Sequence, residues 1–268
     1  MKLKLLLLFF CSGVTAAVFA DVVNLGANHD TTIFQNNVTN SAGAAPGIFA
    51  GTNGASSPRR GLMSFDLSSI PAGAIITNVQ LTLTVGQIAG SGGSGGTSTE
   101  TIGLFALSSG WGEGTNGASS SIGGGGQGNA ALPTSGDATW SSSAYSQTPW
   151  LTPGGDFVSP ASASLLLLNA TPGASFTWLS TAQLVADVQG WLNNPAMNHG
   201  WELINADETD PTTFDAFYSR EGMSVAGVTA SQLPDLQITY TVPEPVSGSL
   251  AAVAILAMCC LRPRHRRA

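Results

Sequence analysis

The middle of this 268-residue chain contains no cysteine and no lysine. All residues of these two types lie near the chain ends: Lys2, Lys4, Cys11, Cys259 and Cys260. Residues 21–241 therefore cannot form a disulfide bond, use a thiol nucleophile or form a lysine Schiff base. This part of the chain must be held by packing, alone or together with a bound metal.

Histidine is almost as scarce. His29 and His199 are the two histidines of residues 21–241, and neither stands in a metal-binding spacing such as His-x-x-x-His. We expect both at surface or turn positions. Because nucleophilic catalysis has so few candidate residues, we predict that the protein is not an enzyme. Spacing alone does not exclude a carboxylate pair of the kind that glycosidases use.

Positive charge is also rare in this segment. Arg59, Arg60 and Arg220 are its only strongly basic residues, against fifteen aspartates and glutamates. Such an acidic surface repels nucleic acid and anionic lipid, which excludes both as expected partners. It either attracts divalent cations or serves solubility alone.

The chain begins with the pattern of a secretory signal peptide. Lys2 and Lys4 precede an apolar run at 5–10, and small residues continue to Ala20. We expect signal peptidase to remove residues 1–20, so that the rest of the chain is exported.

The chain ends with Pro243-Glu244-Pro245, an apolar run at 246–261 and four arginines after it. A helix over this run would be about 24 Å long, somewhat short of the ~30 Å hydrocarbon core. Flanking arginines can reach the interface and place this end in the cytoplasm. The run therefore predicts a short inner-membrane anchor.

This order of segments over residues 242–268 resembles a PEP-CTERM sorting signal. The resemblance implies recognition by an exosortase in the inner membrane of a Gram-negative bacterium. It also implies cleavage near Pro243-Glu244-Pro245, after which the protein stays in the cell envelope or extracellular matrix.

Between the two ends, short β-type runs alternate with turn-forming residues. Residues 78–85 alternate polar and apolar side chains, which is typical of a half-buried strand. We predict an all-β domain over 21–241, a jelly-roll-like β-sandwich, with flexible surface loops at 86–99 and 110–137. The expected strands are 22–25, 32–35, 62–67, 75–85, 101–107, 174–179, 201–205, 213–218 and 236–242.

One short helix is predicted to pack on an edge or end of the sandwich. Ser180 and Gln183 have the spacing of a capping box. Apolar side chains recur at helical spacing over residues 184–192, and residues 193–195 end the helix.

Several segments of the domain, taken in order, resemble a known family. The segments are 60–74, 111–114, 138–140, 150, 154–157, 198–201, 217–221 and 233–240. Together they resemble the DNRLRE domain, a carbohydrate-binding module of the CBM96 type, over nearly all of residues 21–241. The resemblance implies a β-sandwich that binds polysaccharide without catalysis. Some members recognise alginate, which three arginines in an acidic domain do not favour.

The candidate ligand-binding residues are of two kinds. Arg59, Arg60 and Arg220 either face a ligand or bond acids such as Asp66 or Glu221 and so hold strands together. Exposed tryptophans can stack on sugar rings, and Trp111 and Trp150 lie in or beside the long loops, where they either bind sugar or anchor the loops. The same alternatives apply to Trp140. Three further tryptophans have core patterns: Trp178, Trp191 and Trp201.

Loop aspartates are the candidate metal ligands. Asp137 and Asp156 lie among loop residues, as do Asp207 and Asp210, and carboxylate oxygens suit Ca²⁺. None stands in EF-hand spacing. We expect no cofactor other than this possible Ca²⁺.

The sequence thus predicts an exported surface or matrix protein whose β-sandwich binds extracellular polysaccharide of unknown identity. Two alternatives stay open: a structural or adhesive envelope protein without a specific glycan, and a glycan-active hydrolase or lyase.

Overall fold

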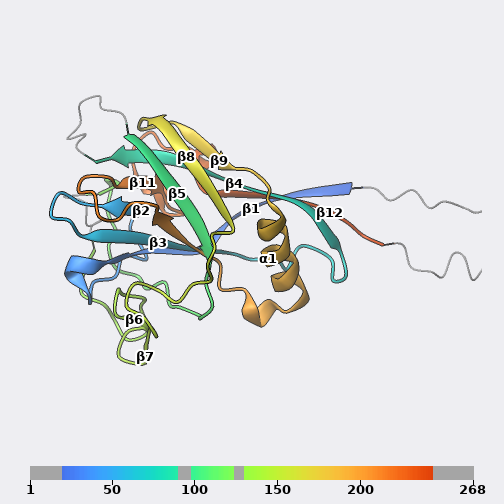
Figure 1. Ribbon diagram of the computed structural model, residues 1–268, viewed down its shortest axis with the longest axis horizontal. Coiled ribbons are helices and arrows are strands. Elements are labelled where there is room, and N and C mark those ends of the chain that lie inside the picture. The colour runs from blue at the N-terminus through green and yellow to red at the C-terminus, as the bar shows by residue number, and fades with distance from the viewer. Residues whose placement is uncertain (1–19, 90–97, 124–129, 244–268) are drawn as a thin grey trace, which may run out of the picture.

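A computed structural model describes residues 20–89, 98–123 and 130–243 of the chain (Figure 1). The described part consists of antiparallel strands, one α-helix and several short 3₁₀ turns. It is an all-β sandwich with one short helix, as the sequence predicts. The strands are β1 (Ala20–Phe34), β2 (Gly47–Thr52), β3 (Pro58–Phe65), β4 (Ile75–Ile88), β5 (Ser98–Ala106), β6 (Ser142–Ala144), β7 (Thr148–Pro149), β8 (Ala163–Ala170), β9 (Ser175–Trp178), β10 (Trp201–Asn205), β11 (Asp215–Tyr218) and β12 (Asp235–Thr241).

The long first strand, β1, belongs to both layers of the sandwich. Its first half pairs with β12, from Ala20 opposite Thr241 to Gly26 opposite Asp235. After an irregularity near His29 its second half pairs with β3. One layer continues from β12 to β4 and β9, and the other from β3 to β10, β5 and β8. Strands β11 and β2 connect β4 with β3.

Strand β4 shows why the sequence adopts this arrangement. Val79, Leu81, Leu83 and Val85 are buried between the layers, as the alternation over residues 78–85 predicts. They belong to one large apolar core with Trp178 and Trp201, both of which are almost completely buried. Burial of each large side chain contributes about 1.5–3 kcal/mol relative to exposure. The core prediction for Trp178, Trp191 and Trp201 is confirmed.

Helix α1 (Ala182–Asn193) packs against the beginning of β4. Gln189 fixes it there, since its side-chain oxygen accepts from the N–H of Ile76 and its amide donates to the carbonyl of Ala74. Trp191 is on the buried face of the helix, and its ring centroid lies 4.6 Å from that of Trp201. The helix ends at Asn193, as predicted.

The predicted capping box is absent, and the helix begins one residue later than this box would place it. Thr181 is the N-cap, and its hydroxyl accepts from the N–H of Leu184. The hydroxyl of Ser180 accepts instead from the N–H of Val79, which ties the turn to β4. Gln183 donates to Asp187 and takes no part in the cap.

Two strand predictions also differ from the structure. The expected strands 22–25 and 32–35 are one strand, β1, because the chain crosses from one layer to the other without a turn. Strands β2, β6, β7 and β8 are not among the expected strands. The four leucines of β8 do not alternate with polar residues, and two of them, Leu166 and Leu168, are exposed.

A second, smaller apolar cluster lies outside the layer that contains β3 and β10. Leu62 and Ile33 pack there against Trp140 and Trp150, which come from the connection between β5 and β8. This connection carries the small β6–β7 hairpin, at the bottom of Figure 1. The predicted loop 110–137 is therefore packed against the sandwich where the structure describes it.

Candidate ligand cavity and the fate of the predicted sites

A cavity of about 580 Å³ lies where the irregular part of β1 and the end of β3 meet helix α1. Its walls also include the loop 66–72, the segment 110–111 and the turn 195–199. Its volume is within the ~300–1,000 Å³ of typical small-molecule sites.

Trp111 forms an aromatic wall of this cavity and is partly exposed. Its indole N–H donates to the carbonyl oxygen of His199 at 2.9 Å, which fixes the orientation of the ring. The ring of His29 meets it edge to face, with 6.3 Å between the centroids. Of the sequence candidates for ligand binding, Trp111 is the one that lines the cavity.

The two histidines lie in the same cavity although 170 positions separate them. His29 is exposed, and its Nδ1 lies 2.9 Å from the side-chain nitrogen of Asn28. Partial burial lowers the pKa of His199. The prediction of surface or turn positions describes both residues but misses that they meet. No spacing signal could reveal this, since the register of β1 and the turn after α1 bring them together.

Hydrogen-bond acceptors complete the lining. The side chain of Asn198 donates to the carbonyl of Phe65 at 2.8 Å, and its own oxygen has no partner among the described residues. The Asp66 carboxylate is exposed, and the N–H and hydroxyl of Ser68 donate to it. These hydrogen bonds lower the pKa of Asp66.

Arg59 does not face a ligand. It is fully buried, and its guanidinium lies 5.8 Å from the ring centre of Phe34 and 5.9 Å from that of Phe214. One nitrogen donates to the carbonyl of Ser57, while Nε and Nη2 have no partner in the described part of the chain. Burial lowers its pKa to about 10. Its prediction as a ligand-binding residue is wrong, because the guanidinium cannot be reached.

Arg60 pairs with acids and aromatic rings. It bonds both oxygens of Glu208, at 2.8 and 2.6 Å, and donates to the carbonyl of Gly154. Its guanidinium lies 5.1 Å from the ring centre of Trp140. The strand-holding alternative is therefore correct for Arg60, with Glu208 in place of the expected Asp66.

Arg220 is half-exposed and also engaged. It bonds both oxygens of Glu113, at 2.7 and 2.9 Å, and its Nε lies 2.8 Å from Glu221. Its own backbone N–H donates to the buried carboxylate of Asp30. The expected Arg220–Glu221 pair is confirmed, and its guanidinium is held by acids away from the cavity.

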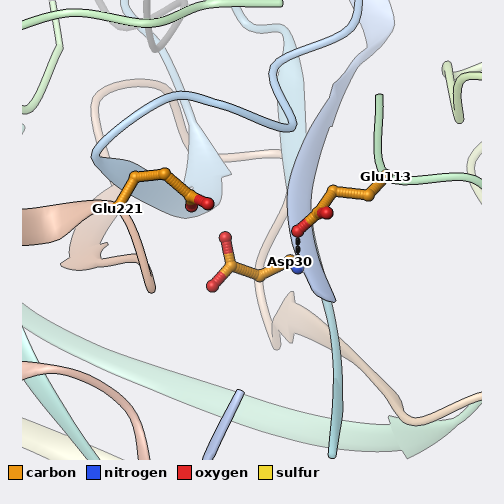
Figure 2. Close-up of side chains that lie close together, drawn as sticks. All are labelled: Asp30, Glu113 and Glu221. Atoms are coloured by element: carbon orange, nitrogen blue, oxygen red, sulfur yellow. Dashed lines mark hydrogen bonds between the residues drawn. The ribbon is translucent and has the colours of Figure 1, made fainter. Parts of the chain in front are cut away.

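Asp30, Glu113 and Glu221 form an acidic cluster, with ligand-type oxygens within 4.8 Å of one another (Figure 2). The N–H of Asp30 donates to Glu113 at 2.8 Å. Burial raises the pKa of Asp30 well above its usual range. Arg220 supplies the positive charge next to this cluster. The three carboxylates come from distant segments, so no sequence motif predicts that they meet.

The predicted calcium ligands have another role. Asp137 accepts hydrogen bonds from Ser41, Asn116 and Thr134, and Asp156 accepts from the N–H groups of residues 151 and 152. Both side chains are buried. Their oxygens fix loops through N–H and O–H donors, and the calcium prediction stays a prediction. Asp207 and Asp210 are exposed, and Asp207 accepts from Thr209.

Trp150 is not a sugar-stacking residue. It is 4% exposed, and its indole N–H donates to the carbonyl of Thr139 at 2.8 Å. Trp140 is buried in the same cluster. The loop-anchoring alternative is therefore correct for both, and the ligand-binding prediction for Trp150 is wrong.

No protein-family model matches the chain, and no curated protein matches it. The DNRLRE and PEP-CTERM resemblances therefore stay predictions. Within residues 20–89, 98–123 and 130–243, no helix is long and apolar enough to cross a membrane. The predicted signal peptide up to residue 19, the span 246–261 and the sorting-motif residues Glu244 and Pro245 lie outside the described residues; Pro243 lies within them.

Proposed function

We propose that this chain is an exported, non-catalytic surface or matrix protein that binds polysaccharide through the cavity beside Trp111. The observation that carries the proposal is an aromatic wall facing polar side chains in a cavity of about 580 Å³. Sugars present apolar C–H faces and a rim of hydroxyls, so a site for them needs both kinds of surface.

The fixed indole of Trp111 supports this function. Because its N–H is already bonded to His199, the ring is held in one orientation before a ligand arrives. A pre-oriented aromatic side chain loses little conformational freedom on binding, which favours affinity. The exposed carboxylate of Asp66 provides acceptors for hydroxyl groups.

The composition of the lining favours binding over hydrolysis. Glycoside hydrolysis generally needs two carboxyl groups about 5–10 Å apart across the scissile bond. Among the described residues that line the cavity, Asp66 is the only one with a carboxylate. The proposal therefore assigns no catalytic role to the chain.

The surface location in the proposal comes from the sequence. Residues 1–20 have the pattern of a signal peptide and 242–268 that of a sorting signal, with signal peptidase, an exosortase and the inner membrane as partners. Ala20 and Thr241 lie opposite each other on β1 and β12. Both segments therefore join the domain at the same place.

Titration of the full chain in mild detergent against a panel of neutral, amino and acidic polysaccharides tests this function. We expect at least one polysaccharide to bind, and Trp111→Ala to abolish binding while the protein stays folded by circular dichroism. Tyr145→Ala, an aromatic truncation in the same connection but outside the cavity, serves as the matched control.

Two results would count against the proposal. A folded protein that binds no polysaccharide would favour the structural or adhesive alternative. Binding that survives in Trp111→Ala, or that is lost equally in Tyr145→Ala, would move the site away from this cavity.

A further inference from the structure

The cavity is unusual in the sign of its charge. Asp66 is its one carboxylate, and no lysine or arginine is among its described lining residues. The hydrogen bonds from Ser68 keep this carboxylate ionised, since they stabilise the charged form.

The arginines of the described residues are all held elsewhere. Arg60 bonds Glu208, Arg220 bonds Glu113 and Arg59 is buried between two phenylalanines. With fifteen acids in residues 21–241, the surroundings add negative potential to that of Asp66. Such a field raises the local concentration of cations and repels anions.

Several hydrogen-bond donors of the cavity are already used within the protein. The indole N–H of Trp111 donates to the carbonyl oxygen of His199, one N–H of the Asn198 amide donates to the carbonyl of Phe65, and the hydroxyl of Ser64 donates to Asn28. The carboxylate of Asp66 can accept more than the two bonds from Ser68. The cavity therefore suits a ligand that brings N–H or O–H donors.

We infer, on the basis of the proposed polysaccharide binding, that the cavity takes a sugar unit with a free amino group, such as an N-deacetylated hexosamine. The ammonium group has three donors and no acceptor, which complements this lining. It pairs with Asp66, and the sugar face stacks on Trp111, whose ring also attracts a cation. An acidic sugar would be repelled by Asp66, the one carboxylate among the described lining residues.

Three oligosaccharides of equal length test this inference with the full chain: a glucosamine oligomer, its N-acetylated form and an oligomer of a uronic acid. At about pH 7, where a carboxyl of normal or lowered pKa is ionised and a histidine of ordinary pKa is mostly neutral, we expect the amine to bind about tenfold more tightly than the N-acetylated form. The uronic acid should not bind. Raising NaCl from about 0.05 to 0.5 M should weaken only the amine.

Asp66→Asn and Asp207→Asn form a matched pair. Each aspartate is exposed and accepts from the N–H and hydroxyl of the residue two positions later, but only Asp66 lines the cavity. We expect Asp66→Asn to lose the preference for the amine and keep the binding of the N-acetylated form. Asp207→Asn should bind like the original protein.

The outcomes separate the two proposals. If no oligosaccharide or polysaccharide binds, the proposed function and this inference both fail. If the N-acetylated or acidic form binds as well as the amine, only the inference fails. It also fails if a lysine tetrapeptide binds as tightly as the amine, or if both aspartate variants lose affinity equally, since either result shows attraction to overall charge.

Discussion

A nitrogen of the Arg60 guanidinium lies 3.6 Å from a carboxyl oxygen of Glu202, a side chain with no exposed surface. Neither oxygen of Glu202 has a hydrogen-bond partner among the described residues, so the charge of Arg60 is its main stabilising contact. Burial raises the pKa of Glu202 well above its usual range, and Arg60 opposes this shift.

Replacement of Arg60 by methionine should destabilise the fold by about 3–5 kcal/mol, because it leaves a buried acid without its cation. Arg220→Met is the comparison, since the Arg220–Glu113 pair is 41% and 10% exposed, more than the Arg60–Glu202 pair, and its loss should cost less. Urea unfolding of both variants measures the difference. Equal losses would contradict the importance of the buried pair.

Stability should fall as pH rises from about 4 to about 7 because of Asp215, and this contribution should be constant above that range. Burial raises its pKa to about 7, and its Oδ1 has no hydrogen-bond partner within the described residues. The folded state holds this proton over a range of pH in which the unfolded chain, with a pKa near 3.9, has lost it. Folding is therefore opposed progressively above about pH 4, by up to roughly 4 kcal/mol once the group ionises in the folded state.

Asp215→Asn removes this ionisation. Melting temperatures between about pH 5 and 8.5 should fall less steeply in the variant than in the original protein, and the variant should be the more stable one at high pH. Parallel curves would show that Asp215 does not titrate in this range.

Trp150→Ala should destabilise the protein by about 3–5 kcal/mol, as expected for a buried indole that also loses its bond to Thr139. Trp111→Ala should cost distinctly less, because that ring is partly exposed and borders a cavity. Thermal unfolding distinguishes them. A larger loss for Trp111 would reverse the roles given to the two residues.

Calcium and a chelator should leave the melting temperature of the original protein unchanged. The oxygens of Asp137 and Asp156 accept from N–H and O–H donors, and Arg220 neutralises part of the charge of the Glu113–Glu221 pair. Differential scanning calorimetry with millimolar Ca²⁺ or EDTA measures this. A calcium-dependent rise would confirm the metal prediction, and Asp137→Asn, Asp156→Asn and Glu113→Gln would then locate the site.

Gly155→Ala should be more damaging than Gly173→Ala. Both glycines have positive φ, at 109° and 91°, so each substitution carries about 1–2 kcal/mol of backbone strain. A methyl group at Gly155 would also overlap the buried carboxylate of Glu202, whereas one at Gly173 meets nothing within 4 Å. The difference between the two variants in free energy of chemical unfolding isolates the steric contribution. Equal losses of stability would show that the loop moves aside.

Local pattern predicts much of this fold. The alternation in β4 places Val79 and Leu81 in the core, and helical spacing places Leu184, Val188 and Trp191 on the buried face of α1. Such periods depend only on the geometry of one element, so a single sequence contains them. Where the pattern lacks a period, as in β8, the prediction fails.

The candidate site depends on contacts between distant segments. Trp111 was a candidate by composition, but nothing in the sequence links it to His29 and His199, or links Arg60 to Glu208 rather than to Asp66. These pairs follow from strand order and register. No local signal in the sequence encodes which distant strands become neighbours.

The sequence by itself determined the all-β class and, for residues 21–241, the absence of disulfides and the scarcity of cations, because composition and side-chain periodicity decide these properties without long-range contacts. Tertiary structure decided which arginines are buried or paired with acids, and so cannot bind a ligand. It also decided where an acidic, aromatic cavity forms. The crossing of β1 between layers brings Asn28 and His29 next to the end of β3 and the turn after α1, and only that juxtaposition creates a place for a ligand.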